Sequence, residues 1–235
     1  EQALIDWGAR LRHGPRLDRL LGDREAELGC VAIRGLVGGA KAGIHAYVTT
    51  TFDPVTAKTR LLELVRERAY KDGIDIVLAS GKRSDFYING KKVSLHPEGL
   101  WLIAKLLLDK LKAYPEITAI GGLTLGADPL ASAVAALSWE SGQNLSAFLV
   151  RKEAKGHGLG ARIEGDLEAG QKVCVIEDTV TTGGSAKKAI DAVLEDGAVP
   201  VVVMAIADRE DPDAAPFRAE HKVECLVTLS EIRAS

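Results

Sequence analysis

Two adjacent carboxylates next to a loop of threonines and glycines are the residues with the clearest chemical potential. Residues 173–176 are apolar and predict a buried strand, and Glu177 and Asp178 follow it directly. A helix is predicted over 185–196. The start of a helix binds anions, because its free N–H groups and its dipole both favour negative charge. We expect a phosphate there and sugar hydroxyls on the carboxylates.

The loop between the carboxylates and the helix supplies further donors. Thr181, Thr182 and Ser185 carry hydroxyls, and Gly183 and Gly184 let backbone N–H groups converge on one anion. The alternative is an ordinary turn in which Asp and Thr side chains only cap the helix. The complete pattern favours a site for a phosphorylated sugar. It contains neither a Gly-Lys-Ser/Thr loop nor a GxGxxG turn.

A basic loop follows the strand predicted at 145–150. Arg151, Lys152, Lys155 and His157 lie within seven residues, and glycines at 156, 158 and 160 give the loop mobility. A run of charges is usually a solvated surface loop. A mobile cationic loop after a strand is also suited to close over a leaving group with several negative charges, such as pyrophosphate.

The elements that must position these residues alternate along the chain. Four apolar runs predict strands, and four amphipathic or Ala-rich runs predict helices. Such alternation indicates an α/β fold with a mostly parallel sheet covered by helices on both faces, and ligands bind at the carboxyl ends of its strands. The predicted strands are 117–121, 145–150, 173–176 and 199–206, and the predicted helices are 57–72, 97–114, 128–141 and 185–196.

The N-terminal part of the chain differs from the rest. Residues 1–54 contain glycine clusters but no α/β alternation, and their basic and acidic residues balance. They do not resemble a nucleic-acid-binding arm. We therefore expect an N-terminal extension of unassigned role over 1–54 and one catalytic domain over 55–235. Within that domain, extended runs at 76–79 and 86–89 predict a small ribbon around a polar loop.

Composition excludes several classes of function. The net charge of −3 gives no general attraction to nucleic acid or to an anionic membrane. No apolar run approaches the roughly 18–20 residues of a membrane span, and no signal peptide is visible. Cys30, Cys174 and Cys225 are far apart, which argues against a disulfide framework and a CxxC metal site. We infer a reducing, cytoplasmic location, with Cys174 in the core.

Three motifs resemble those of a known family. The run Val-Cys-Val-Ile-Glu-Asp-Thr-Val-Thr-Thr-Gly-Gly-Ser at 173–185 resembles the PRPP-binding signature of type I phosphoribosyltransferases. Arg-Lys-Glu-Ala-Lys-Gly-His-Gly at 151–158 is similar to the catalytic loop of orotate phosphoribosyltransferases, and 80–89 is similar to their orotate-binding ribbon. The resemblance spans about residue 57 to the C-terminus. It implies the type I phosphoribosyltransferase fold with an N-terminal hood.

The same resemblance implies a reaction. Ribose 5-phosphate would pass from PRPP to orotate, giving orotidine 5′-phosphate and pyrophosphate in pyrimidine biosynthesis. Mg²⁺ would be held by the substrate and not by a dedicated protein site. The enzyme would be a homodimer whose basic loops act across the subunit boundary.

Residue roles follow from the resemblance as well. Lys152, Lys155, His157 and Asp178 would be catalytic, and Arg209 would pair with the carboxylate of orotate. Phe86 and Tyr87 would flank the base, or could instead be core residues of the ribbon. The full set of expected substrate contacts is Phe86, Tyr87, Arg151, Lys152, Lys155, His157, Glu177, Asp178, Thr179, Val180, Thr181, Thr182, Gly183, Gly184, Ser185 and Arg209.

The sequence departs from the family pattern at two positions. Leu125 and Ala79 stand where some relatives carry lysines, which leaves those two contacts open. Arg209 could also be a surface arginine. A transferase for another base and a non-catalytic PRPP-sensing regulator remain as alternative functions.

Overall fold

The computed structural model describes residues 52–77, 81, 83–153 and 162–234. The predictions for 1–51, Ala79, Lys155 and His157 therefore lie outside the described residues. The first described helix, α2 (Pro54–Leu64), is capped by the Asp53 carboxylate, which accepts hydrogen bonds from the N–H groups of Val55 and Thr56. The predicted division of the chain at residue 54 stays a prediction.

The centre of the fold is a six-stranded sheet with the order β10-β9-β8-β5-β6-β7. Every neighbouring pair is parallel except β6–β7, which is antiparallel. The mostly parallel sheet predicted from the alternating pattern is thus confirmed. The strands are β5 (Ala119–Leu123), β6 (Ser146–Val150), β7 (Ile163–Glu164), β8 (Lys172–Val180), β9 (Val199–Asp208) and β10 (Val223–Thr228).

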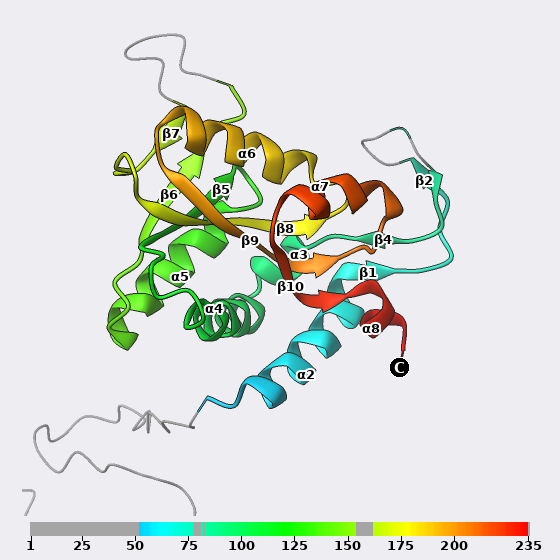
Figure 1. The fold of residues 1–235 in the computed structure, drawn as a ribbon. Helices are drawn as coiled ribbons and strands as arrows, with labels where there is room; N and C mark the ends of the chain where they lie inside the picture. The colour runs from blue at the N-terminus through cyan, green and yellow to red at the C-terminus, as the bar shows by residue number, and fades with distance from the viewer. Residues whose placement is uncertain (1–51, 78–80, 82, 154–161, 235) are drawn as a thin grey trace, which may run out of the picture. The chain divides into compact units, whose positions relative to one another are not determined.

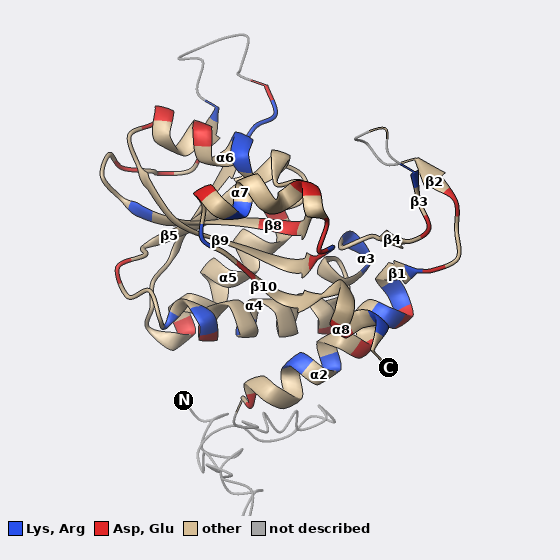
Figure 2. Ribbon diagram, turned by 45° about the vertical axis from the view of Figure 1, so that its right-hand side comes forward, with Lys and Arg blue, Asp and Glu red and all other residues tan. Residues whose placement is uncertain are grey.

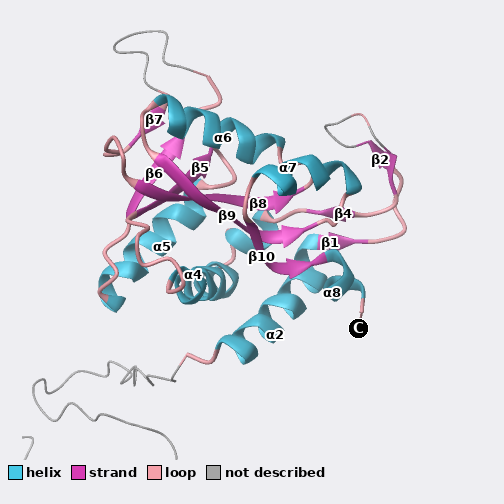
Figure 3. Ribbon diagram, viewed as in Figure 1, coloured by secondary structure: helices cyan, strands magenta, loops and turns pink. Residues whose placement is uncertain are grey.

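Helices cover both faces of this sheet. In Figures 1 and 3, α6 (Gly184–Glu195) and α7 (Ala215–Glu220) lie on one face, and α4 (Pro97–Leu111) and α5 (Asp128–Ser141) lie on the other. The middle strands are buried from both sides, and Cys174 is fully buried among them, as expected. No helix among the described residues is long and apolar enough to cross a membrane.

Four short strands build a ribbon beside the carboxyl ends of the main sheet. β1 (Tyr70–Lys71) pairs with β4 (Tyr87–Ile88), and β2 (Ile76–Val77) pairs with β3 (Arg83–Ser84). The ribbon was predicted, but its pairing was not: the described part of the run at 76–79 pairs with β3, and the run at 86–89 pairs through β4 with β1. A short helix, α3 (Lys91–Ser94), follows the ribbon and was not predicted either.

Several element boundaries differ from the sequence prediction. The predicted helix 57–72 ends earlier, because a π-helical turn at Val65–Ala69 leads into strand β1. β8 continues to Val180, so the two carboxylates lie inside the strand and not after it. The reason is that β8 pairs with β9 along this polar stretch. The turn at Pro212–Ala214, strand β10 and helix α8 (Leu229–Arg233) had no prediction.

Candidate active site

Two cavities meet at the carboxyl ends of β5, β8 and β9. The smaller has a volume of about 190 Å³ and the larger about 490 Å³. Their shared lining consists of Lys91, Glu177, Asp178 and Ser185. One elongated ligand can therefore occupy both cavities and pass over the two carboxylates between them.

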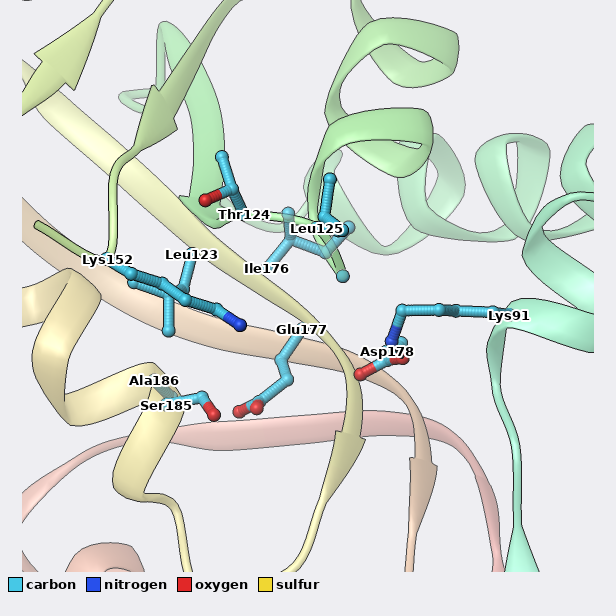
Figure 4. Close-up of a pocket in the computed structure, with 11 residues that line it drawn as sticks. Lys91, Leu123, Thr124, Leu125, Lys152, Ile176, Glu177, Asp178, Ser185 and Ala186 are labelled. Atoms are coloured by element: carbon cyan, nitrogen blue, oxygen red, sulfur yellow. Dashed lines mark hydrogen bonds and ion pairs between the residues drawn. The ribbon is translucent and has the colours of Figure 1, made fainter.

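The smaller cavity lies between β8 and the loop that follows β5. Figure 4 shows Lys152 and Lys91 extending toward it from different sides, with the Glu177 carboxylate between them. The end of β5 contributes Leu123, and the loop contributes Thr124, Leu125 and Gly126 and leads into helix α5. A chain entering a helix in this way presents N–H groups to an anion.

The larger cavity contains the predicted phosphate loop. Its lining includes Thr179 near the end of β8, Thr181 and Thr182 of the loop, and Gly184 and Ser185 at the start of α6. Arg209 and the ribbon residue Tyr87 complete this part of the lining. The structure thus brings together the sugar-phosphate motif, the ribbon and the arginine that the sequence analysis placed far apart along the chain.

Gly183 fixes the shape of the phosphate loop. It is the N-cap of α6 and has a left-handed backbone with φ of 82°. A Cβ atom at this position would come within 2.3 Å of the Phe217 ring. Because an L side chain would be strained here and would also collide with α7, the turn that opens α6 requires glycine.

The two carboxylates have different surroundings. Burial and the neighbouring Asp178 charge raise the pKa of Glu177 to about 7, although hydrogen bonds from Ser185 and from the Ala186 backbone act in the opposite direction. Asp178 accepts a hydrogen bond from the Thr179 N–H at 2.9 Å, and its other oxygen lies 2.9 Å from the Lys91 ammonium. The raised pKa of Glu177 makes its protonation sensitive to pH near neutrality.

Arg209 is a buried cation and not a surface residue, with a relative exposure of 5%. It donates a hydrogen bond to the Ser84 hydroxyl at 3.1 Å, and its guanidinium lies 4.3 Å from the centre of the Phe86 ring. Burial lowers its pKa from the ordinary value. Its Nε is buried without a hydrogen-bond partner in the described part of the chain, which favours a ligand that supplies an acceptor.

Comparison with known proteins gives the family. No protein-family model matches the chain. An orotate phosphoribosyltransferase of Thermosynechococcus vestitus is 45% identical over 179 residues, which are 75% of this chain and 93% of the relative. An orotate phosphoribosyltransferase of Nostoc sp. is 43% identical over 185 residues, which are 78% of this chain and 88% of the relative.

The chain belongs to the orotate phosphoribosyltransferases. Enzymes of this family transfer a phosphoribosyl group in pyrimidine biosynthesis.

Solved structures agree with this assignment. The orotate phosphoribosyltransferase of Mycobacterium tuberculosis in complex with Fe(III) dicitrate has a TM-score of 0.65 and 37% identity, covering 75% of this chain and 99% of the other. A phosphoribosyltransferase from Corynebacterium diphtheriae has a TM-score of 0.63 and 38% identity, with coverage of 75% and 98%. The M. tuberculosis enzyme with PRPP has a TM-score of 0.61 and 31% identity, with coverage of 75% and 92%.

Some predicted site residues line neither of the two cavities. Arg151 pairs with Glu164 of β7 at 2.6 Å. The Val180 side chain is buried in the core, and its carbonyl accepts a hydrogen bond from the Arg209 N–H. Phe86 lies beside Arg209 and lines a third, neighbouring cavity. The roles of these residues stay predictions.

The sequence analysis missed four residues with polar or charged side chains that line the larger cavity. They come from the end of the ribbon, from α3, from α6 and from the segment after β9: Asn89, Lys91, Lys188 and Asp211. A helical wheel of 185–196 would place Lys188 one turn after the phosphate loop. For the other three we find no local sequence signal, because their position depends on how the ribbon packs against β8.

The boundary of the two cavities offers two carboxylates, Glu177 and Asp178, as oxygen ligands for a metal ion. Within the described ranges, no group of three or more His, Cys, Asp or Glu residues could hold a metal ion. Glu177 and Asp178 are adjacent hard donors facing a phosphate loop, which fits a Mg²⁺ ion that takes its remaining ligands from substrate and water.

Proposed function

We propose that one PRPP molecule spans the two cavities. Its phosphoribosyl group is transferred to an orotate molecule that lies beside Arg209 in the larger cavity. The observation that carries this proposal is the set of residues common to both cavities, which includes the two carboxylates and Ser185. The 5-phosphate would lie in the loop at 181–185, the ribose hydroxyls on Glu177 and Asp178, and the pyrophosphate in the smaller cavity.

Orotate is the base that Arg209 fits best. A buried guanidinium with an unused N–H is suited to a planar ligand that carries a carboxylate, because charge-assisted bidentate contacts are strong and geometrically specific. Tyr87 and Phe86 lie near enough to flank the base. Adenine and uracil have no carboxylate and leave this cation without a counter-charge.

The chemistry needs no covalent nucleophile. Loss of pyrophosphate leaves oxocarbenium-like charge on the ribose, as in glycoside cleavage, and a base nitrogen forms the new bond. The residues position the two reactants, neutralise the leaving group and exclude water. Mg²⁺ bound to PRPP would help to orient the pyrophosphate and offset its charge, and Glu177 and Asp178 are the protein groups that would hold it.

Three further parts of the proposal concern the whole enzyme. The basic loop, with Lys152, Lys155 and His157, closes over the pyrophosphate. The enzyme is a homodimer in which this loop reaches the neighbouring subunit's substrate. The three widely separated cysteines favour the reducing cytosol as its location.

A base panel tests the function. Purified protein is incubated with PRPP and Mg²⁺ together with orotate, uracil, adenine or xanthine, and consumption of each base is followed. We expect orotate alone to be consumed, and only when both PRPP and Mg²⁺ are present. Consumption of another base in preference to orotate would refute the proposed specificity. PRPP binding without any base consumption would favour the regulator.

A further inference from the structure

Lys91 occupies a special position in the site. Among the residues that the structure describes, it is the only cation that lines both cavities: Lys152 lines only the smaller, and Lys188 and Arg209 line only the larger. The boundary between the cavities is also where the bond from ribose to pyrophosphate would lie. Lys91 is therefore near the point at which negative charge develops during the reaction.

A close backbone approach holds Lys91 in this position. A Cβ atom at Gly90 would lie 3.0 Å from Asp178 Cβ and 3.2 Å from Thr179 Oγ1, so no side chain separates the start of α3 from β8. The Lys91 ammonium can thus reach Asp178 Oδ2 at 2.9 Å. Figure 4 shows the lysine extending to this carboxylate, and Figure 2 shows α3 as a basic segment beside the site.

The ion pair leaves the lysine available to a ligand. The Lys91 side chain is 46% exposed, whereas the Asp178 side chain is 17% exposed. An ammonium group has three donors, and only one is used by Asp178 in the described structure. The pair can therefore open or be shared when an anion enters, at little cost for a partly solvated contact.

The wall of the smaller cavity opposite Lys91 is uncharged. Residues 123–126 are Leu, Thr, Leu and Gly, and Leu125 is 71% exposed. Pyrophosphate in this cavity would therefore depend on cations from elsewhere. Lys91 comes from the short helix α3, which packs on α4 and on the π-helical turn and whose N-cap Gly90 lies against β8, so it is in place before any loop closes.

We propose that Lys91 binds the leaving pyrophosphate of PRPP, which extends the proposed function and rests on it. As the bond from ribose C1 to oxygen breaks, its electron pair goes to the pyrophosphate oxygen, and a base nitrogen supplies the pair for the new bond and loses its proton to water. Lys91 donates a hydrogen bond to the pyrophosphate and transfers no proton. Its departure from Asp178 frees that carboxylate for the ribose hydroxyls.

Binding of inorganic pyrophosphate with Mg²⁺, measured by calorimetry without orotate, tests this role. We expect Lys91→Met to weaken pyrophosphate binding roughly tenfold or more, since one charge-assisted hydrogen bond is lost. Lys91→Arg should retain most of the affinity. Lys92→Met is the matched control, because Lys92 is an exposed neighbour on α3 that lines neither cavity. Equal affinity for Lys91→Met and wild type would overturn the proposal.

A double-mutant comparison separates direct contact from an effect through Asp178. Lys91→Met should still weaken pyrophosphate binding when Asp178 is already Asn. If the effect disappears in that background, Lys91 acts only by neutralising Asp178, and the proposal is wrong. Adding Leu125→Lys to Lys91→Met should restore part of the affinity, since it returns a cation to the same cavity.

The outcome is distinguishable from failure of the proposed function. If the wild-type protein binds pyrophosphate through Lys91 but consumes no base, the transferase reaction is refuted and the Lys91 site stands. If the wild type consumes orotate and Lys91→Met binds pyrophosphate normally, only the assignment of Lys91 fails.

Discussion

Glu177 is the residue whose protonation the site controls most strongly. Burial raises its pKa from 4.5 to about 7, so the folded protein favours the neutral carboxyl. The resulting stabilisation is fully present below pH 4.5 and is lost as the pH rises through about 7. We expect Glu177→Gln, which stays neutral, to gain stability over the ligand-free wild type as the pH rises from about 5 to 8, by on the order of 2–3 kcal/mol.

Denaturant unfolding of both proteins across this pH range measures the effect. Asp178→Asn is a poor control because it removes the Lys91 ion pair, so Glu140→Gln, at an exposed carboxylate of α5, serves instead. A stability difference between Glu177→Gln and wild type that does not vary with pH would mean that Glu177 has an ordinary pKa.

Arg209 should govern affinity for the base and not for PRPP. Arg209→Ala removes a charge-assisted, bidentate contact with the orotate carboxylate, which costs about 1.5–3 kcal/mol, or roughly tenfold to a hundredfold in the KM for orotate. Arg209→Lys should have an intermediate effect, because it keeps the charge and loses the planar fork. Steady-state kinetics with each substrate varied in turn measures both terms. Equal increases in the KM for orotate and the KM for PRPP would mean that Arg209 does not contact the base.

The sequence predicts those site residues that are consecutive along the chain, and it misses those that only packing brings together. Glu177, Asp178 and the hydroxyls of 181–185 are consecutive, so their type and order already indicate a sugar-phosphate site. Lys91 gives no such signal, because only the packing of α3 on β8 brings it to Asp178. Arg209 could be chosen as the cation after a long strand, but its burial against Phe86 depends on the ribbon.

At the scale of elements, the C-terminal helix α8 supports the ribbon. Thr228 and Glu231 form a capping box that starts the helix. Arg233 near its end donates a hydrogen bond to Tyr70 at 2.8 Å and lies 4.7 Å from the centre of the Phe86 ring, which Arg209 also contacts. The helix thus helps to position the aromatic ring that lies beside the base-binding arginine.

Removing this support should affect the base site mildly. We expect Arg233→Ala to raise the KM for orotate about twofold to fivefold with little change in kcat, since partly exposed cation–π and ion-pair contacts contribute modestly. Arg60→Ala is the control, because Arg60 is a partly exposed arginine of α2 whose ion pairs with Glu63 and Glu98 lie away from the ribbon. An orotate KM that is unchanged by Arg233→Ala, or that rises equally in the control, would mean that α8 does not help to position the base site.

The elements themselves were predictable where the pattern is local and strong. The helix at 128–141 has the predicted bounds, and the four apolar strands all exist. The prediction was wrong where pairing between distant segments decides the structure. The polar end of β8 is extended because β9 lies beside it, and residues 70–71 leave the predicted helix because they pair with β4.

At the scale of the whole molecule, the proposed homodimer with a shared loop leads to a complementation test. Lys155→Ala should reduce the chemical rate, because loop closure is tightest as charge develops on pyrophosphate. Mixing this variant with Arg209→Ala should restore activity to about one quarter of wild type, since half of the dimers are mixed and one of their two sites has neither defect. If subunits are shown to exchange and no activity returns, Lys155 acts within its own subunit.

The most direct test of the central claim is turnover by Glu177→Gln/Asp178→Asn. Both carboxylates line both cavities, at the boundary where the ribose would lie. Orotate consumption with saturating PRPP and Mg²⁺ should fall by about a hundredfold or more, as expected when groups that stabilise the transition state are removed, while circular dichroism shows an intact fold. A correctly folded double variant with near-wild-type turnover would contradict the account.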